Sequence, residues 1–354
     1  MKKISVLIID DSLLIRKVLT SILSTAPDIE VVGAAEDPLI ARDMIKQLNP
    51  DVLTLDIEMP RMNGITFLRN LMRLRPTPVI MISMLTECGA EATLDALALG
   101  AVDFVAKPRM DTESTLNDYA KEIISKVRIA AKTNVKGISS SPAQETAPIV
   151  KQIPSIKKAP ITDFKKIITL GSSTGGTEAI KVVMKSMPAD SPPILITQHL
   201  PAAFSESFVK HIDLITEMKA SIPVNGQVVE WGNIYLAPGD RHMAVVRNKT
   251  QYVIELHDTE PVNHHKPAVD VLFHSAAQAA GDNAVCVLLT GMGADGAAGM
   301  QAMHALGAKT IVQNEATSVV WGMPGAAFKL GCADHVLPLE DIAAKILTLI
   351  KGLR

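Results

Sequence analysis

Short apolar runs alternate with stretches of helical hydrophobic period along most of the chain, in two separate blocks. In the first block, residues 4 to about 132, each of five strand-length runs is followed by a segment whose apolar residues recur every three to four positions. This alternation predicts a doubly wound α/β domain with a five-stranded parallel sheet. The predicted strands are Ile4–Ile9, Val31–Ala35, Val52–Leu55, Val79–Ile82 and Val102–Val105, and the predicted helices are Leu13–Leu23, Ile40–Leu48, Ile65–Leu74, Ala90–Leu99 and Leu116–Ile129.

A second block of the same kind begins at Ile167. It predicts another doubly wound α/β domain with a mostly parallel sheet, and the Val, Ile and Gly content of Ser221–Leu256 adds a β-hairpin. The predicted strands are Ile167–Leu170, Ile194–Gln198, Ile234–Ala237, Val285–Leu289 and Thr310–Val312, and the predicted helices are Thr177–Ser186, Phe204–Ile215, Val269–Ala280, Ala297–Leu306 and Leu339–Ile350.

The two blocks are separated by a segment without periodicity. Between residues 133 and 162 the chain is rich in serine and proline and carries the Lys157-Lys158 pair, a composition typical of an exposed linker. A chain of 354 residues is also long for one hydrophobic core. We therefore predict a first domain over residues 1–128, a linker over 129–162 and a second domain over 163–354.

Composition narrows the functional classes. A net charge of −2 and a pI near 6.5 argue against a nucleic-acid partner, which requires a basic face. Three scattered cysteines suit neither a disulfide framework nor a zinc site and fit a reducing compartment. The N-terminus does not look like a signal peptide, and no apolar stretch is long enough to span a membrane. We expect a cytoplasmic monomer that does not insert into membranes.

Acidic residues gather at the predicted strand ends of the first domain. Asp10 and Asp11 follow the first strand and Asp56 ends the third, so the topology brings three carboxylates together at one edge of the sheet. Any one of them alone is more simply explained as a helix cap. Together they suit Mg²⁺, and with Ser83 and Lys107 at the next strand ends they suit a transferring phosphoryl group. Asp56 is the best-placed nucleophile.

The second domain opens with a Gly-X-Ser-X-Gly turn over residues 171–175, between a predicted strand and a predicted helix. Such a turn lifts the hydroxyl of Ser173 into a cleft, and amides at the helix N-terminus can stabilise an oxyanion. A phosphate-binding loop would require lysine where Thr177 stands, and a dinucleotide fingerprint would require glycine at position 173. Ser173 is therefore a candidate nucleophile.

A histidine and an aspartate at later strand ends can complete a triad with Ser173. His199 follows Ile194–Gln198 and is expected at the same sheet edge, where it can take the hydroxyl proton. Asp295 lies in the glycine-rich extension of Val285–Leu289 and can hold the histidine tautomer. The remaining histidines, among them His257, His264 and His265, are expected to be ordinary loop residues.

The loop that carries Asp295 offers an alternative function. Residues 291–296 read Gly-X-Gly-X-X-Gly between a strand and a helix, with Glu315 about twenty residues further on, as in NAD-binding α/β enzymes. Asp295 would direct a carboxylate into the pyrophosphate cradle, which disfavours this interpretation. The glycines are better explained as room for the backbone to approach Ser173 and His199.

The first domain resembles the receiver domains of two-component signalling, which have a flavodoxin-like fold. The similarity rests on Asp56-Ile57-Glu58-Met59-Pro60, Asn63-Gly64 and Ala106-Lys107-Pro108. It implies that Asp56 is phosphorylated by a chemotaxis histidine kinase. It further implies that Asp10, Asp11, Asp56 and the Glu58 carbonyl serve Mg²⁺, and that Ser83 and Lys107 contact the phosphoryl group.

Over its full length the chain resembles the chemotaxis response regulators with protein-glutamate methylesterase activity. The resemblance implies hydrolysis of glutamate methyl esters, and deamidation of selected glutamines, on cytoplasmic helices of methyl-accepting chemoreceptors. It implies Ser173 as nucleophile, His199 as base and Asp295 as orienting residue, with Met292 and Thr174 as oxyanion donors and no cofactor for the ester step. The matching segments are Gly171–Gly176, Thr197–Pro201, Ala237–Asp240, Pro261–Asn263, Val269–Phe273, Leu289–Gly299, Gln313–Ala316 and Gly322–Pro324.

A two-domain chain with a flexible connection also predicts how the activity is controlled. We expect the unphosphorylated receiver to cover the Ser173 cleft and phosphorylation of Asp56 to loosen it. A transcriptional output is disfavoured, because the second domain is Gly-rich, of neutral charge and lacks a basic recognition helix.

Overall fold

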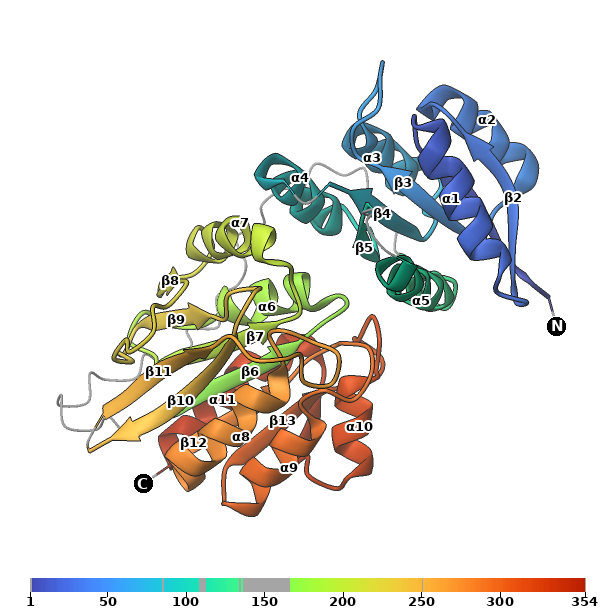
Figure 1. Cartoon of the computed structure of the whole chain (residues 1–354). Coiled ribbons are helices and arrows are strands. Elements are labelled where there is room, and N and C mark those ends of the chain that lie inside the picture. The colour runs from blue at the N-terminus through green and yellow to red at the C-terminus, as the bar shows by residue number, and fades with distance from the viewer. Residues whose placement is uncertain are drawn as a thin grey trace. The chain divides into compact units, whose positions relative to one another are not determined.

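The computed structural model describes residues 2–84, 86–107, 113–133, 135, 166–249 and 251–353. It separates into two compact units, residues 1–144 and 145–354, which are described here one at a time (Figure 1). The predicted linker, residues 129–162, lies mostly outside the described residues, and α5 (Glu113–Ala130) extends to its first two positions. None of the helices in the described parts of the chain is both long enough and apolar enough to cross a membrane.

The described residues of the first unit form a parallel sheet in the order β2-β1-β3-β4-β5. Its strand boundaries agree with the prediction to within two residues, and the predicted five-stranded α/β fold is confirmed. The strands are β1 (Ile4–Ile9), β2 (Ile29–Ala35), β3 (Val52–Asp56), β4 (Val79–Ser83) and β5 (Asp103–Ala106), and the helices before α5 are α1 (Leu13–Ser24), α2 (Pro38–Leu48), α3 (Gly64–Leu74) and α4 (Glu87–Ala98).

Buried strands and capped helix N-termini explain why the strands and helices of the first unit form where they do. Strands β3 and β4 are buried at every position, as expected for central strands covered by helices on both faces. Side chains of Ser12, Asp37 and Asn63 cap the N-termini of α1, α2 and α3 by accepting backbone hydrogen bonds. The carboxyl ends of β1 and β3, which are neighbours in the sheet, therefore meet at one fixed edge.

Within the described residues, the second unit has a parallel sheet in the order β14-β13-β12-β6-β7-β9-β8, and the hairpin β10–β11 forms a separate antiparallel ribbon. This confirms the predicted second α/β domain. Strand β6 lies between β7 and β12, so the loops after these three strands share one edge. The strands are β6 (Ile167–Ser172), β7 (Ile194–Gln198), β8 (Lys219–Ser221), β9 (Asn233–Leu236), β10 (His242–Asn248), β11 (Gln251–His257), β12 (Ala284–Leu288), β13 (Lys309–Gln313) and β14 (His335–Leu337).

Helices cover both faces of the second sheet (Figure 1). Helices α8, α9 and α10 pack side by side on one face, and α6, α7 and α11 pack on the other. The sequence pattern did not reveal β8, β14 or α10, because three-residue strands and a seven-residue helix are too short to show a period. The helices are α6 (Gly176–Met184), α7 (Ala202–Asp213), α8 (Val269–Ala280), α9 (Ala297–Ala305), α10 (Met323–Lys329) and α11 (Leu339–Gly352), with a short 3₁₀ turn at Gly281–Asn283.

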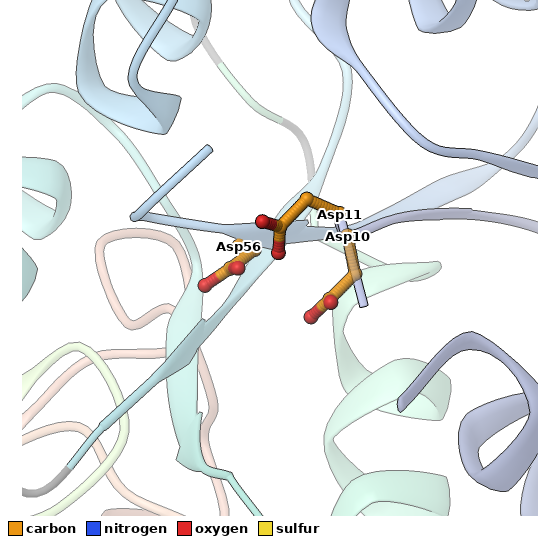
Figure 2. Close-up of side chains that lie close together, drawn as sticks. All are labelled: Asp10, Asp11 and Asp56. Atoms are coloured by element: carbon orange, nitrogen blue, oxygen red, sulfur yellow. The ribbon is translucent and has the colours of Figure 1, made fainter. Parts of the chain in front are cut away.

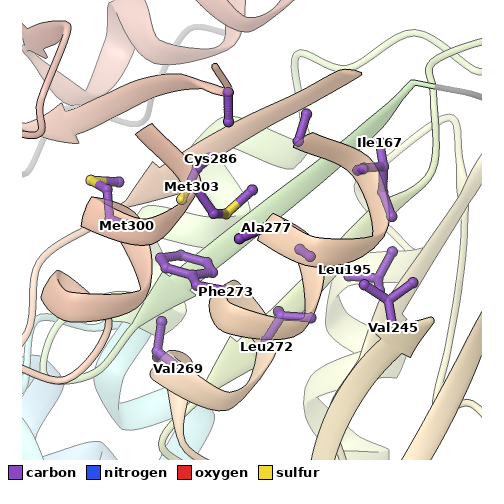
Figure 3. Close-up of a cluster of buried hydrophobic side chains, with 14 of the residues drawn as sticks. Ile167, Leu195, Val245, Val269, Leu272, Phe273, Ala277, Cys286, Met300 and Met303 are labelled. Atoms are coloured by element: carbon purple, nitrogen blue, oxygen red, sulfur yellow. The ribbon is translucent and has the colours of Figure 1, made fainter. Parts of the chain in front are cut away.

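Helix α8 is the centre of the second unit's core (Figure 3). Its alanines allow close approach to the neighbouring elements, while Leu272 and Phe273 fill the space between α9, the hairpin and the sheet. Both side chains are fully buried. Packing on this scale fixes the N-terminus of α8, which begins at Val269, next to the loops that follow β6, β7 and β12.

Candidate active site and acidic pocket

Ser173 lies in the tight turn between β6 and α6, as the sequence predicts, and its side chain is only partly buried. The backbone amide of Ser173 donates to the Thr290 carbonyl at 3.0 Å, and its carbonyl accepts from the Gly176 amide at 2.7 Å. Gly175 has φ 75°, a left-handed conformation that glycine adopts without strain. These contacts fix the backbone of the turn that carries Ser173.

Side-chain hydrogen bonds tie this turn to β7. The Ser172 hydroxyl donates to Gln198 Oε1 at 2.5 Å, and Gln198 Nε2 donates to the Ser173 carbonyl at 2.9 Å. Ser172 and Gln198 are also paired in the parallel register, and the His199 amide donates to the Ser172 carbonyl at 3.3 Å. Ser173 and His199 directly follow this paired position on the neighbouring strands β6 and β7, so they lie at the same edge of the sheet.

His199 and Asp295 are joined by a hydrogen bond of 2.8 Å between Nε2 and Oδ2. Both side chains are buried, with 8% and 1% of their surface exposed. The Nδ1 atom of His199 is buried as well, and it has no hydrogen-bond partner among the described residues. Because a carboxylate can only accept, Asp295 favours the tautomer protonated at Nε2 and leaves Nδ1 as the proton acceptor.

The Asp295 carboxylate accepts three further hydrogen bonds. They come from the amides of Val269 and Asp270 at 2.6 and 3.1 Å, and from Asn263 Nδ2 at 2.9 Å. Burial by itself would raise the pKa of Asp295, but the hydrogen bond and charge of His199 and the hydrogen bonds from Asn263 and the Val269 amide lower it to about 2. Asp295 is thus a permanently ionised anchor for the imidazole.

The glycine-rich loop over 291–296 packs against this site in two places. A Cβ atom at Gly291 would lie 2.9 Å from the Ser173 Cβ and 2.2 Å from the Met323 Sδ. A Cβ atom at Gly296 would lie 2.6 Å from a methyl carbon of Val269, whereas Gly293 faces open space. The close approach to Ser173 is therefore made by Gly291, and the loop's carboxylate, that of Asp295, is bound to His199. The oxyanion roles expected of Met292 and Thr174 stay predictions.

Two functional candidates escaped the sequence analysis, Asn263 and His265. Asn263 binds Asp295 as described above, and the His265 ring is stacked on the His199 ring, with 3.7 Å between centroids and 14° between planes. His265 lies in a loop, as expected, but it contacts the His199 ring, which the sequence analysis did not predict. Only the Pro261-Val262-Asn263 segment among the family-like motifs pointed to this loop, and nothing in its pattern indicated a contact with His199.

The acidic pocket of the first unit forms as predicted at the ends of β1 and β3 (Figure 2). Carboxylate oxygens of Asp10, Asp11 and Asp56 all lie within 4.8 Å of one another. Lys107 reaches in after β5, with Nζ 2.7 Å from Asp56 Oδ2 and 3.5 Å from Asp10 Oδ2. One ammonium group thus faces three carboxylates, which leaves a surplus of negative charge.

The pKa values of two carboxyl groups in this pocket, Asp56 and Asp10, are raised. Burial raises the pKa of Asp56 to about 6, against the hydrogen bond from Lys107 and with added repulsion from Asp10. Burial also raises the pKa of Asp10, whose Oδ2 makes no hydrogen bond within the described part of the chain. The ammonium group nearest to this oxygen, that of Lys107, is 3.5 Å away and is closer to Asp56. A buried carboxylate oxygen that makes no hydrogen bond to any described residue, beside two more carboxylates, fits a hard cation with oxygen ligands such as Mg²⁺.

The other predicted residues of this pocket are less closely placed. The Ser83 hydroxyl, at the end of β4, donates to the carbonyls of Met84 and Gly89 at 3.2 and 3.3 Å. Glu58 lies two residues beyond β3 with an exposed side chain. The expected roles of Ser83 on a phosphoryl group and of the Glu58 carbonyl on Mg²⁺ remain predictions.

Comparison with known proteins agrees with both units. The family model "Response regulator receiver domain" matches residues 6–117, and "CheB methylesterase" matches residues 168–346. The chain is 51% identical to the protein-glutamate methylesterase/protein-glutamine glutaminase of Hydrogenovibrio crunogenus, over 99% of this chain and 100% of that one. It is 52% identical to protein-glutamate methylesterase/protein-glutamine glutaminase 1 of Xanthomonas campestris pv. campestris, over 98% of this chain and 97% of that one.

A solved structure gives the same result for the second unit. The crystal structure of the Thermotoga maritima CheB methylesterase catalytic domain is 34% identical, with a TM-score of 0.51, covering 52% of this chain and 98% of that one. Fold and site together define a response regulator whose receiver domain is joined to an α/β hydrolytic domain. The chain belongs to the CheB methylesterase family.

Proposed function

We propose that this protein hydrolyses methyl esters of glutamate side chains, and deamidates selected glutamines, on cytoplasmic helices of methyl-accepting chemoreceptors. The observation that carries the proposal is the buried His199–Asp295 pair beside Ser173, with the Nδ1 atom of His199 left to accept a proton. The names of the relatives support both substrates, because an ester and an amide of the same side chain differ only in the leaving group. The proposed substrates place the activity in the cytoplasm.

The chemistry is acyl transfer through a covalent intermediate. Ser173 Oγ attacks the ester carbonyl carbon while its proton passes to His199 Nδ1, and the Asp295 carboxylate stabilises the imidazolium that forms. The proton then goes to the leaving methoxy oxygen, and methanol departs; when the substrate is an amide, the proton goes to the amide nitrogen and ammonia departs. Water, deprotonated by the same nitrogen, hydrolyses the acyl-enzyme and restores Ser173 and a glutamate carboxylate. We assign the oxyanion to the backbone around Met292 and Thr174.

The receiver unit supplies the control. Asp56 is the proposed phosphorylation site, with a chemotaxis histidine kinase as donor and Lys107 and Ser83 facing the phosphoryl group. Asp10, Asp11, Asp56 and the Glu58 carbonyl would hold Mg²⁺, which neutralises charge on a phosphoryl group as it is transferred. Restoring carboxylates on a receptor helix changes the charge repulsion within it and so biases its conformational equilibrium.

Methanol release from receptors carrying labelled methyl esters tests the function directly. The full-length chain should release methanol faster after addition of Mg²⁺ and a small-molecule phosphodonor, and Asp56→Asn should abolish this stimulation. Ser173→Ala should abolish release altogether while phosphorylation of Asp56 continues. Release that persists in Ser173→Ala would exclude Ser173 as the nucleophile.

Removal of the receiver tests the proposed domain division and the blocking model together. A chain without residues 1–132 should fold and should show higher basal esterase activity than the unphosphorylated full-length protein. A well-folded fragment with equal or lower activity would contradict the idea that the receiver covers the Ser173 cleft. Sedimentation of the full-length chain would test the expected monomer.

A further inference from the structure

A two-residue turn brings His265 to the site. The Val262 and His265 backbones exchange hydrogen bonds of 3.0 and 2.9 Å, and the two residues between them, Asn263 and His264, have φ values of 53° and 67°. Left-handed backbone at two consecutive non-glycine residues is uncommon and costs free energy. The surrounding contacts must therefore hold this turn in place.

Those contacts come from both sides of the turn. His242, a fully buried residue of β10, joins the two flanks, because its Nδ1 accepts from the Ala268 amide and its Nε2 donates to the Glu260 carbonyl, each at 3.1 Å. Asn263 Nδ2 donates to Asp270 Oδ2 at 2.7 Å and to Asp295. The turn is thus fixed to the hairpin, to α8 and to the site carboxylate at once.

The stacked pair of rings is the consequence. With centroids 3.7 Å apart and planes 14° apart, the His265 ring covers one face of the His199 imidazole. The hydrogen bond to Asp295 restrains one ring atom of that imidazole, Nε2, but does not by itself fix the plane of the ring. A flat partner in van der Waals contact restricts tilting of the imidazole plane and so fixes the direction in which Nδ1 points.

We propose that His265 is a positioning residue, whose stacked ring holds the His199 imidazole in the orientation that presents Nδ1 to Ser173. This inference rests on the proposed esterase function. The role requires a flat aromatic surface and no proton transfer by His265 itself. Phenylalanine at position 265 therefore preserves it, and alanine removes it.

Steady-state methanol release from methylated receptors by the full-length, phosphodonor-activated protein tests the proposal. His265→Ala should lower kcat by about 10- to 100-fold with KM within about twofold, since misorientation of a catalytic group acts on the chemical step. His265→Phe should retain kcat within about threefold. The matched control is His264→Asn, which changes the exposed neighbour in the same turn and keeps a residue that tolerates a left-handed backbone. It should be as active as the unaltered protein.

Ring nitrogen NMR of His199 separates positioning from a merely structural effect. The unaltered protein and His265→Phe should show the single Nε2-protonated form, whereas His265→Ala should show a mixture of forms or broadened signals. Melting temperature should stay within a few degrees in all variants. Full activity in His265→Ala, equal losses in the alanine and phenylalanine variants, or an unchanged His199 spectrum in an inactive His265→Ala would each overturn the proposal. If the unaltered protein released no methanol, the esterase function would fail, and the spectra alone would still decide whether His265 orients His199.

Discussion

Asp56 and Asp295 are two buried aspartates whose pKa values are shifted in opposite directions. Asp56 is the last residue of β3 and Asp295 lies in the loop that follows β12, and each is almost completely buried, with 1% and 3% of the residue exposed. Burial raises the pKa of Asp56 to about 6, whereas the pKa of Asp295 falls to about 2 in spite of burial. Burial alone therefore does not decide the direction in which the pKa of an aspartate is shifted.

The difference lies in the partners. Asp56 shares one ammonium group, that of Lys107, with a second buried carboxylate, Asp10. Asp295 accepts from two backbone amides, a carboxamide and an imidazole. Hydrogen-bond donors on all sides stabilise the ionised form of Asp295 without any further ligand. Asp56 faces another carboxylate, and a bound cation would offset this repulsion. Under the proposed function, the surroundings of Asp295 suit a catalytic residue that needs no activation, and those of Asp56 suit a site that phosphorylation switches.

The largest expected effect is on the rate of catalysis when Asp295, the partner of His199, is replaced. Asp295→Asn should reduce kcat for methanol release by about 10³- to 10⁴-fold, because an amide can donate to His199 Nε2 and so stabilise the wrong tautomer. The control, Asp258→Asn, alters an exposed aspartate paired with Lys266 and should leave kcat unchanged. A loss smaller than tenfold in Asp295→Asn would mean that the carboxylate does not orient His199.

Replacing each aspartate by asparagine should change the free energy of unfolding in opposite directions in the two units. An ionised Asp56 is unfavourable in the folded state, and this cost is present above pH 6 and disappears as the pH falls from about 6 to about 4. Asp56→Asn should thus raise the unfolding free energy of the receiver unit at pH 7 by on the order of 2 kcal/mol. Asp295 stabilises above pH 4, and this contribution is lost as the pH falls through about 2. Asp295→Asn should therefore lower stability at pH 7.

Urea unfolding with chelator present, at pH 7 and at pH 4.5, measures both effects. The increase in unfolding free energy caused by Asp56→Asn should be smaller at pH 4.5 than at pH 7. The decrease caused by Asp295→Asn should be present at both pH values. Asp118→Asn, on the exposed surface of α5, is the control and should change neither midpoint. Shifts of the same sign in the two Asn variants would invalidate the comparison.

Binding of Mg²⁺ should weaken in mild acid. A metal ligand must lose its proton, and with a pKa of about 6 Asp56 is about nine-tenths ionised at pH 7 and about one-tenth ionised at pH 5. Calorimetric titration of the full-length chain should therefore give an affinity about tenfold lower at pH 5 than at pH 7. An affinity independent of pH over this range would show that Asp56 is either not a ligand or not perturbed.

The smallest effect on kcat is expected at Ser172, the residue before the proposed nucleophile. Ser172→Ala removes the donor to Gln198 Oε1, which costs about 1–3 kcal/mol when the acceptor stays buried and unpaired. Because the bond from Gln198 Nε2 to the Ser173 carbonyl remains, kcat should fall by no more than about threefold while the melting temperature falls by a few degrees. A tenfold loss of kcat at unchanged melting temperature would show that Ser172 acts on the reaction itself.

Much of this protein could be predicted from the pattern of its residues. The strand–helix alternation located both sheets, because five-residue apolar strands and amphipathic helices leave clear periods. Parallel topology then brought Asp10 together with Asp56, and Ser173 together with His199, since the strand ends of such sheets share an edge. Strands β8 and β14 were missed because three residues carry no period.

The sequence by itself determined the two α/β units, the acidic pocket and the candidate triad, because each depends on local periodicity and on which strand ends a residue follows. Tertiary structure alone decided that Asn263 binds Asp295 and that His265 stacks on His199. The turn that makes those contacts is held by a buried histidine of β10 and by Asp270 at the N-terminus of α8. The residues that it contacts, His199 and Asp295, lie far away from it along the chain. Packing, and not spacing, sets such distances.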